Sequence, residues 1–137
     1  MLYLLCMNVL VFGTFDHLHP GHLFLLNEAA KRGDLYVVVA RDANVERFKG
    51  KKSDQPEDER VAAIQSKFPS ATVLLGDADD FLAPVRSVKP DLILLGYDQK
   101  LPPGVSEENL MVPVERLPAF KPDVHKSSLR RRVSGNA

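Results

Sequence analysis

Three of the four histidines in this 137-residue chain fall close together, at His17, His19 and His22. His19 and His22 are three positions apart, so at the start of a helix their imidazoles share one face. An imidazole donates a hydrogen bond to a phosphate oxygen, more strongly when it is charged. Chance produces an H-x-G-H pattern in well under about one in a hundred chains of this size. The pair therefore predicts a polyphosphate site with His19 and His22 as catalytic residues.

Two glycines in the same loop suit the close approach of a ligand. Gly13 ends an apolar run and permits a tight turn. Gly21 removes a Cβ atom where a ligand must come near the backbone, and the amides and dipole of the following helix start form a phosphate cradle. Alternatively, the two imidazoles ligate zinc with Asp16 as the nearest carboxylate. That ligand set is incomplete, so we expect no protein-bound metal.

Two further clusters each have a functional and a structural interpretation. Lys49, Lys51 and Lys52 form either a solvated loop or a mobile lid over ligand phosphates, and nothing in the sequence selects the contacting lysine. Ser127 and Ser128 stand at the start of an expected helix. Their hydroxyls either cap that helix or bind phosphate.

The composition is that of a globular protein with a small-molecule ligand. Eighteen Lys and Arg balance eighteen Asp and Glu, which gives no electrostatic reason to bind nucleic acid or an acidic membrane. The length fits one domain, residues 1–137, and the single cysteine, Cys6, excludes an intrachain disulfide. Residues 1–12 are apolar but too few to span a membrane, so we expect a buried strand and a cytoplasmic protein, with Met1 or Met7 as its start.

Short apolar runs alternate with amphipathic stretches along the chain. This pattern predicts an α/β fold: a Rossmann-like, doubly wound, mainly parallel five-stranded sheet with helices on both faces. Strands are expected at residues 4–12, 35–40, 72–75, 91–95 and 110–117. Helices are expected from Pro20 to Gly33, from Pro56 to Pro69, and at residues 81–87 and 127–133. The first helix should bury Leu23, Leu26 and Ala30, and the second Val61, Ile64 and Phe68.

The predicted sheet also places the site. In doubly wound sheets, ligands bind at the C-terminal edge of the strands, where the strand order reverses. The loop with the histidines, the polar and basic residues 41–53, and residues 96–99 all follow expected strands. We assign no helix or strand to residues 41–53.

The run GTFDHLHPGH at residues 13–22 closely resembles the signature of the cytidylyltransferase-like nucleotidyltransferases. Three other segments have counterparts in that family: the strand end at Arg41-Asp42, the helix start at residues 56–60, and the LGYDQ run at residues 95–99. Together they look most like the archaeal FAD synthetases, which adenylate FMN. Glycerol-3-phosphate cytidylyltransferases share H-x-G-H but usually differ at the GYDQ position.

The resemblance implies transfer of AMP from ATP to FMN, with Mg²⁺ or another divalent cation carried by the nucleotide phosphates. Members of the family are commonly homodimers, so a homodimer is expected here. His19 and His22 would bind the α- to γ-phosphates. Other residues would line the nucleotide site, namely Thr14, Phe15, Gly96, Tyr97, Asp98 and Gln99. Supporting polar groups would be Asp16, Asp42 and Arg60. Candidates for further phosphate contacts would be Ser127, Ser128, Lys121 and Arg131.

Two rival functions stay open on the sequence. One is a cytidylyltransferase, or another sugar- or polyol-phosphate nucleotidyltransferase, that uses CTP. Residues 119–123 depart from the Arg-Thr often seen in the cytidylyltransferases, which counts against glycerol phosphate. The other rival is a nucleotide-binding module without catalysis.

Overall fold

The computed structural model describes residues 7–101 and 104–119. Several expected features lie outside these residues: the expected start of the first strand with Cys6, the expected helix at residues 127–133, and the candidate residues Lys121, Ser127, Ser128 and Arg131.

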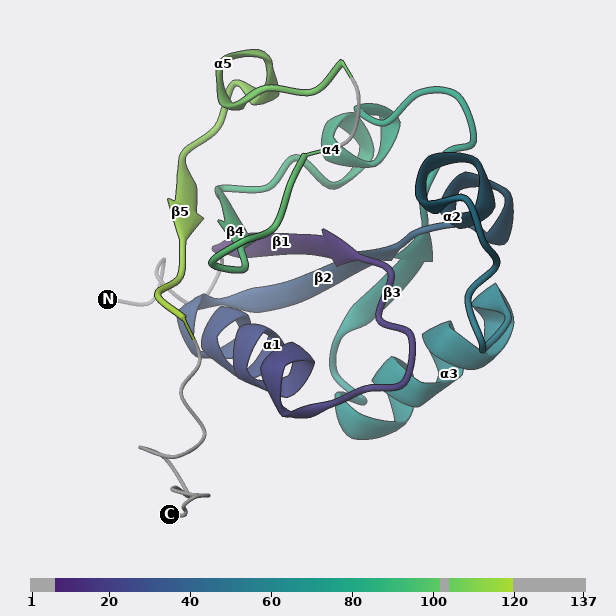
Figure 1. Cartoon of the computed structure of the whole chain (residues 1–137). Helices are drawn as coiled ribbons and strands as arrows, with labels where there is room; N and C mark the ends of the chain where they lie inside the picture. Colours follow the sequence, from purple (N-terminus) through teal and green to yellow (C-terminus); the bar gives the residue numbers. More distant parts are fainter. Residues whose placement is uncertain (1–6, 102–103, 120–137) are drawn as a thin grey trace.

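A five-stranded sheet forms the centre of the molecule, with every neighbouring pair of strands parallel. Its order is β3-β2-β1-β4-β5 (Figure 1). The chain adds β2 and β3 on one side of β1 and then β4 and β5 on the other side, so the winding direction changes between β1 and β4. The expected parallel five-stranded sheet is confirmed. The strands are β1 Asn8–Gly13, β2 Asp34–Val39, β3 Thr72–Leu75, β4 Leu92–Leu95 and β5 Val114–Arg116.

Helices cover both faces of the sheet, as expected (Figure 1). α1 and α3 pack on one face, and α4 and α5 on the other. Within the described residues, every helix is too short or too polar to cross a lipid bilayer. The helices are α1 Pro20–Arg32, α2 Asp42–Lys49, α3 Glu57–Lys67, α4 Ala83–Val88 and α5 Glu107–Leu110.

α1 begins and ends where its sequence predicts. Pro20 occupies its first turn, where a missing amide hydrogen costs nothing, and Gly33 follows its last residue. A Cβ atom at Gly33 would lie 2.3 Å from the carbonyl oxygen of Met7, so only glycine fits there. The expected buried face was partly wrong. Leu25, Leu26 and Ala29 are buried, whereas Ala30 is exposed, because Leu25 and Ala29 stack on the side that meets the sheet.

Two short helices lie where the sequence suggested none. α2 occupies part of the polar residues 41–53, and it is held by the buried Val45 and by Asn44, which donates to the carbonyl of Asp77. α5 overlaps the strand expected at 110–117 only at Leu110, and it begins at a capping box formed by Ser106 and Asn109. β5 covers only Val114–Arg116, so the expected strand was too long at both ends.

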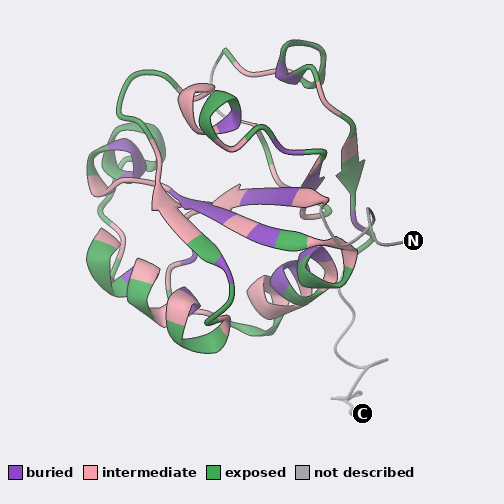
Figure 2. Cartoon of the chain, turned by 180° about the vertical axis from the view of Figure 1, so that it is seen from behind, coloured by how far each residue is buried: buried purple, intermediate pink, exposed green. Residues whose placement is uncertain are grey.

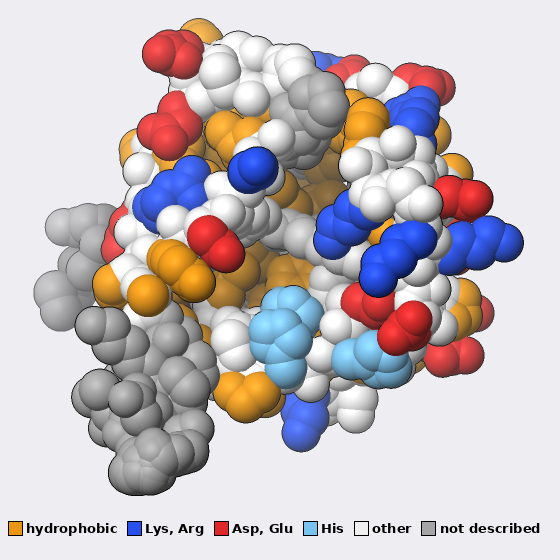
Figure 3. Space-filling model, in the orientation of Figure 1, with side chains coloured by type: hydrophobic (Ala, Val, Ile, Leu, Met, Phe, Trp, Pro, Cys, Tyr) orange, Lys and Arg blue, Asp and Glu red, His pale blue; other side chains and the backbone are white. Residues whose placement is uncertain are grey.

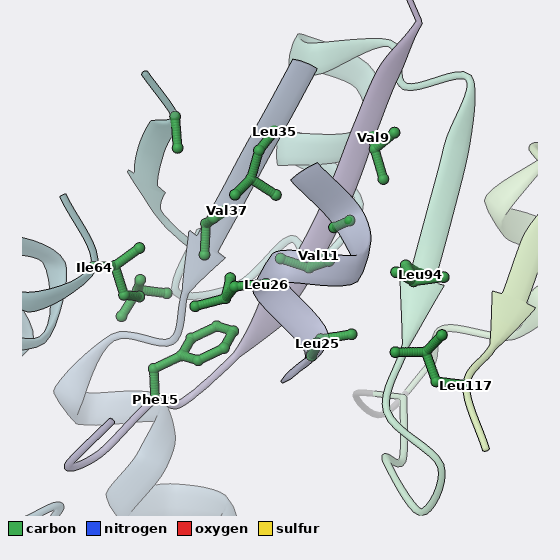
Figure 4. Close-up of a cluster of buried hydrophobic side chains, with 13 residues drawn as sticks. Val9, Val11, Phe15, Leu25, Leu26, Leu35, Val37, Ile64, Leu94 and Leu117 are labelled. Atoms are coloured by element: carbon green, nitrogen blue, oxygen red, sulfur yellow. The ribbon is translucent and has the colours of Figure 1, made fainter. Parts of the chain in front are cut away.

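The core lies in two layers, one on each face of the strands, and the central strands are the most buried part of the chain (Figure 2). On the face covered by α1 and α3, Val9, Val11 and Val37 meet Leu26 and Ile64 (Figure 4). Burial on both faces explains why these strands read as unbroken apolar runs rather than as alternating patterns. The sheet is thereby a rigid base for the loops at its edge.

Candidate active site

A cavity of about 740 Å³ opens at the C-terminal edge of the sheet, between the loops that follow β1 and β4. This is the point where the winding direction changes, the predicted position for a ligand. Figure 3 shows it as a hollow with an apolar floor, bordered by histidine, Lys and Arg side chains. Twelve predicted site residues line it: Gly13, Thr14, Phe15, Asp16, His19, Gly21, His22, Lys49, Gly96, Tyr97, Asp98 and Gln99.

Some predicted residues do not line this cavity, and some lining residues were missed. Asp42, Arg60, Lys51 and Lys52 are not among its walls. The missed residues are mostly apolar, and one is a cation: Phe12, Phe24, Leu25, Lys100, Leu117 and Pro118. Lys100 directly follows the GYDQ run, which was the available signal for it. The position of Leu117 and Pro118 depends on the pairing of β5 with β4, which no local pattern reveals.

His19 caps α1 with its own ring. Its Nδ1 accepts hydrogen bonds from the amides of Gly21, at 3.1 Å, and His22, at 3.4 Å. These amides were expected to cradle phosphate, and in the structure both of them donate to the imidazole of His19. An amide can only donate, so Nδ1 is the acceptor and the ring proton lies on Nε2. His19, which is exposed, therefore offers its Nε2–H as a donor.

Gly21 makes room for this capping ring. A Cβ atom at Gly21 would lie 3.1 Å from Cε1 and 3.2 Å from Nδ1 of His19. The sequence interpretation assigned that space to a ligand. In the structure, the neighbouring imidazole fills it.

His22 is half-buried and stacks on His19, with ring centroids 3.6 Å apart. Phe15 meets the ring of His22 in an edge arrangement at 5.3 Å. The Nδ1 atom of His22 is buried and has no hydrogen-bond partner within the described part of the chain. Burial, followed by the charges of His19 and Lys49, lowers the pKa of His22 to about 4. At neutral pH His22 is thus an uncharged ring.

Phe15 supports the site from below. It is 2% exposed and packs with Leu26 and Ile64 in the core (Figure 4). Its φ of 56° is in the left-handed region, which costs on the order of 1–3 kcal/mol for a residue of this size. A Cβ atom at Gly13 would lie 3.2 Å from the Phe15 ring, so this glycine allows the ring to fold under the loop.

One lysine of the predicted cluster reaches the site. The Nζ of Lys49, at the end of α2, donates to the Thr14 hydroxyl at 3.1 Å. Lys51 and Lys52 are exposed and lie outside the cavity walls. The segment that carries them is anchored further along, where the Asp16 carboxylate accepts from the amides of Asp54 and Gln55.

Arg60 fixes the backbone of residues 14–19, the loop between β1 and α1, which we call the catalytic loop. Its guanidinium is fully buried and donates to the carbonyls of Thr14 and Ala40, each at 2.8 Å, and to that of Gln55. It also pairs with Asp42 at 2.6 Å. Burial would raise the pKa of Asp42, but the bonds from Arg60 and from the Glu57 amide hold it below its usual value. Asp42 and Arg60 are therefore supporting groups.

The loop after β4 is fixed by side chains at two points. Gln99 accepts from the Gly96 amide at 3.0 Å and donates to the carbonyl of Phe12 on β1. Arg116 donates to the carbonyls of Gly96 at 2.9 Å and Gln99 at 2.7 Å. The sequence interpretation did not identify Arg116, because its role depends on β5 lying beside β4.

In the described residues, the side chains that could together bind a metal ion do not include the histidine pair. One group, Asp16, His17 and Asp54, has ligand atoms within 4.8 Å of one another, and it contains neither His19 nor His22. Both Asp16 oxygens already accept backbone amides. This carboxylate is thus an anchor for the neighbouring loop. The same amide bonds, with the charges of His17 and Arg60, lower its pKa despite the opposing effect of burial.

The chain is similar to known proteins along most of its length. It is 42% identical over 122 residues to an FAD synthase of Methanospirillum hungatei, covering 88% of this chain and 77% of that protein. An FAD synthase of Aciduliprofundum boonei is 48% identical over 102 residues, covering 74% of this chain and 68% of that protein.

Solved structures agree with the fold. The lipopolysaccharide core biosynthesis protein from Thermoplasma volcanium superposes with a TM-score of 0.75 at 36% identity, covering 84% of this chain and 98% of that one. A protein of unknown function from Archaeoglobus fulgidus shares the fold at 18% identity and a TM-score of 0.62. The cytidylyltransferase-like family matches residues 10–128. The chain belongs to the cytidylyltransferase-like family.

Proposed function

We propose that this protein is an FMN adenylyltransferase, which transfers AMP from ATP to FMN and yields FAD and pyrophosphate. The observation that carries the proposal is the stacked pair His19 and His22 at the wall of the cavity, in a chain 42% identical to an FAD synthase. The cavity opens between two loops, one carrying the histidines and the other residues 96–99. This arrangement suits a nucleotide whose phosphates meet the first loop and whose base and ribose meet the second.

The reaction needs no protein nucleophile. A phosphate oxygen of FMN forms a bond to the α-phosphorus of ATP, and the bond from that phosphorus to the bridging oxygen breaks. Pyrophosphate leaves with the electron pair. Catalysis of this kind consists of positioning and charge stabilisation. The protein contributes the Nε2–H of His19, the ring of His22 and the ammonium of Lys49.

The charged side chains in the walls of the cavity balance one another, so they leave the negative charge of a triphosphate largely unneutralised, and a cation has to accompany the nucleotide. Among the described lining residues, the carboxylates Asp16 and Asp98 offset the ammonium groups of Lys49 and Lys100. Asp16 is already engaged by two amides, so the walls do not form a carboxylate cage for a metal. They fit a Mg²⁺ that arrives on the nucleotide phosphates and neutralises part of their charge.

The test is a comparison of substrate pairs. The protein is incubated with ATP or CTP, and with FMN or glycerol 3-phosphate, in the presence of Mg²⁺, while pyrophosphate release is followed. We expect turnover with ATP and FMN, accompanied by FAD in the products. Turnover with CTP and glycerol 3-phosphate alone would assign the rival cytidylyltransferase activity. ATP binding without pyrophosphate release from any pair would indicate a binding module.

We also propose that residues 1–137 act as one nucleotidyltransferase domain and that the protein is a homodimer. All five strands belong to one sheet, which supports the first statement. The family resemblance supports the second. Sedimentation equilibrium tests it, and a monomer at micromolar concentration would contradict it. Ser127, Ser128, Lys121 and Arg131 stay predicted phosphate contacts, to be tested by substitution.

A further inference from the structure

Arg116 is the last residue of β5, and its position follows from the register of the sheet. β5 pairs with β4 so that Arg116 lies opposite Leu95, and the amide of Leu117 donates to the carbonyl of Leu95. Residues 96–100 form the loop that follows β4. The side chain of Arg116 therefore starts beside the first residue of that loop.

One nitrogen of the Arg116 guanidinium donates hydrogen bonds to several backbone carbonyls of the loop. Nη1 of Arg116 lies 2.9 Å from the oxygen of Gly96, 3.4 Å from that of Tyr97 and 2.7 Å from that of Gln99. Hydrogen bonds from a charged donor are stronger than those between neutral groups. Gln99 adds a second anchor, since its amide group joins Gly96 to Phe12. The backbone of the loop is thus held from β5 on one side and from β1 on the other.

The held backbone presents side chains to the cavity. Tyr97, Asp98 and Lys100 line the cavity, and Tyr97 is 55% exposed although it is a large aromatic residue. An exposed ring on a fixed loop can contact a ligand at low cost in conformational entropy, because its backbone is already ordered. The histidine pair and Lys49 belong to other elements, and within the described residues they form no hydrogen bond with Arg116.

We infer that Arg116 is a positioning residue, which preorganises the loop at residues 96–100 for the nucleotide and acts on binding rather than on the chemical step. The inference rests on the proposed function for its substrate, ATP. Loss of the guanidinium removes its bonds to the carbonyls of Gly96, Tyr97 and Gln99, of which Gly96 keeps only the bond from the Gln99 amide, and lets the loop sample other conformations. Binding must then order the loop, so the KM for ATP rises, whereas groups that stabilise the transferred phosphate keep their places.

The test compares Arg116→Met and Arg116→Lys with the control Arg32→Met. Arg32 is a matched control because it also bonds β5, through Glu115 at 2.8 Å, but does not touch the loop. We expect the KM for ATP to rise about tenfold in Arg116→Met, the scale of one lost charged hydrogen bond, with kcat within about twofold. Arg116→Lys should recover only part of the loss, since an ammonium lacks the planar fork. Arg32→Met should leave both constants unchanged.

Hydrogen exchange gives a readout that does not depend on turnover. The amides of residues 96–100 should exchange faster in Arg116→Met and Arg116→Lys than in the wild type or in Arg32→Met. Unchanged exchange would overturn the inference, and so would a fall in kcat at constant KM. If Arg116→Met does not fold, Arg116→Lys carries the same comparison. A wild-type protein that releases no pyrophosphate would instead refute the proposed function, while the exchange of this loop still tests Arg116.

Discussion

The imidazole rings of His19 and His22 lie with their centroids 3.6 Å apart and their planes at 21° to each other. His22 is half-buried and close to the cationic Lys49 and to the His19 ring, and this environment keeps it uncharged at neutral pH. The Nδ1 of His19 accepts from amides in the first turn of α1, and that of His22 is buried. The two histidines therefore have different roles: His19 is oriented as a hydrogen-bond donor, and His22 is held in its neutral form.

The neutral state of His22 predicts how stability depends on pH. Its pKa is about 4 in the folded protein, against 6.5 as the ordinary value. As the pH falls from about 6.5 to about 4, the unfolded chain binds a proton that the folded chain does not, so the free energy of unfolding falls. Urea unfolding at pH 7 and pH 5 measures this. The loss should be smaller in His22→Asn, and an equal loss in both proteins would contradict the assignment.

Substitutions of His19 should separate its two roles. Asparagine is a good N-cap but lacks the Nε2–H donor, so His19→Asn should keep the stability of the wild type and lose turnover about a hundred- to thousand-fold. His19→Ala should lose turnover similarly and also lose about 1 kcal/mol of stability with the cap. Thermal unfolding and pyrophosphate release measure the two effects. Wild-type turnover in His19→Asn would refute the donor role.

Lys49 should account for the effect of the lysine cluster on catalysis. It reaches Thr14 in the cavity, whereas Lys51 and Lys52 are exposed outside it. We expect Lys49→Gln to lower kcat/KM by at least about tenfold, because it removes a cation from the phosphate site. Lys51→Gln and Lys52→Gln are the controls and should change it by less than about twofold. Equal losses in all three variants would indicate a lid that acts as a whole.

Gly21→Ala should disturb the site without harming the fold. Alanine is favoured over glycine in a helix by roughly 1 kcal/mol, so the helix itself gains. The new Cβ atom, however, would press on the His19 ring at 3.1 Å. We expect unchanged or higher thermal stability with lower turnover. Gly76→Ala is the control, because its Cβ atom would meet Val38 at an ordinary 3.5 Å. A wild-type rate in Gly21→Ala would show that the ring can move freely.

Local patterns in the sequence were sufficient for the parts of the fold that local forces decide. β3 begins and ends at the predicted residues 72 and 75, and α1 begins at Pro20 after the capping His19. Buried parallel strands and amphipathic helices have strong patterns, and their order determines which loops share the ligand edge. This is why most lining residues could be named in advance.

Tertiary contacts decide the features that were missed. α2 is short and polar, and it depends on contacts with residues 77 and 78, which lie far along the chain. Arg116 acts on a loop about twenty positions earlier, through strand pairing. The use of the α1 amides by His19 is also invisible in sequence, because the H-x-G-H pattern does not say whether the ring turns toward its own helix or toward a ligand.

The buried guanidinium of Arg60 has a consequence for how the protein responds to heat. A single side chain donates to three segments: the backbone of Thr14, Ala40 directly after β2, and Gln55 shortly before α3. None of these segments can loosen alone without leaving a charge or a carbonyl unsatisfied away from water. The catalytic loop should therefore have the same thermal stability as the rest of the domain. On heating, activity should be lost only at the temperature where the whole domain unfolds.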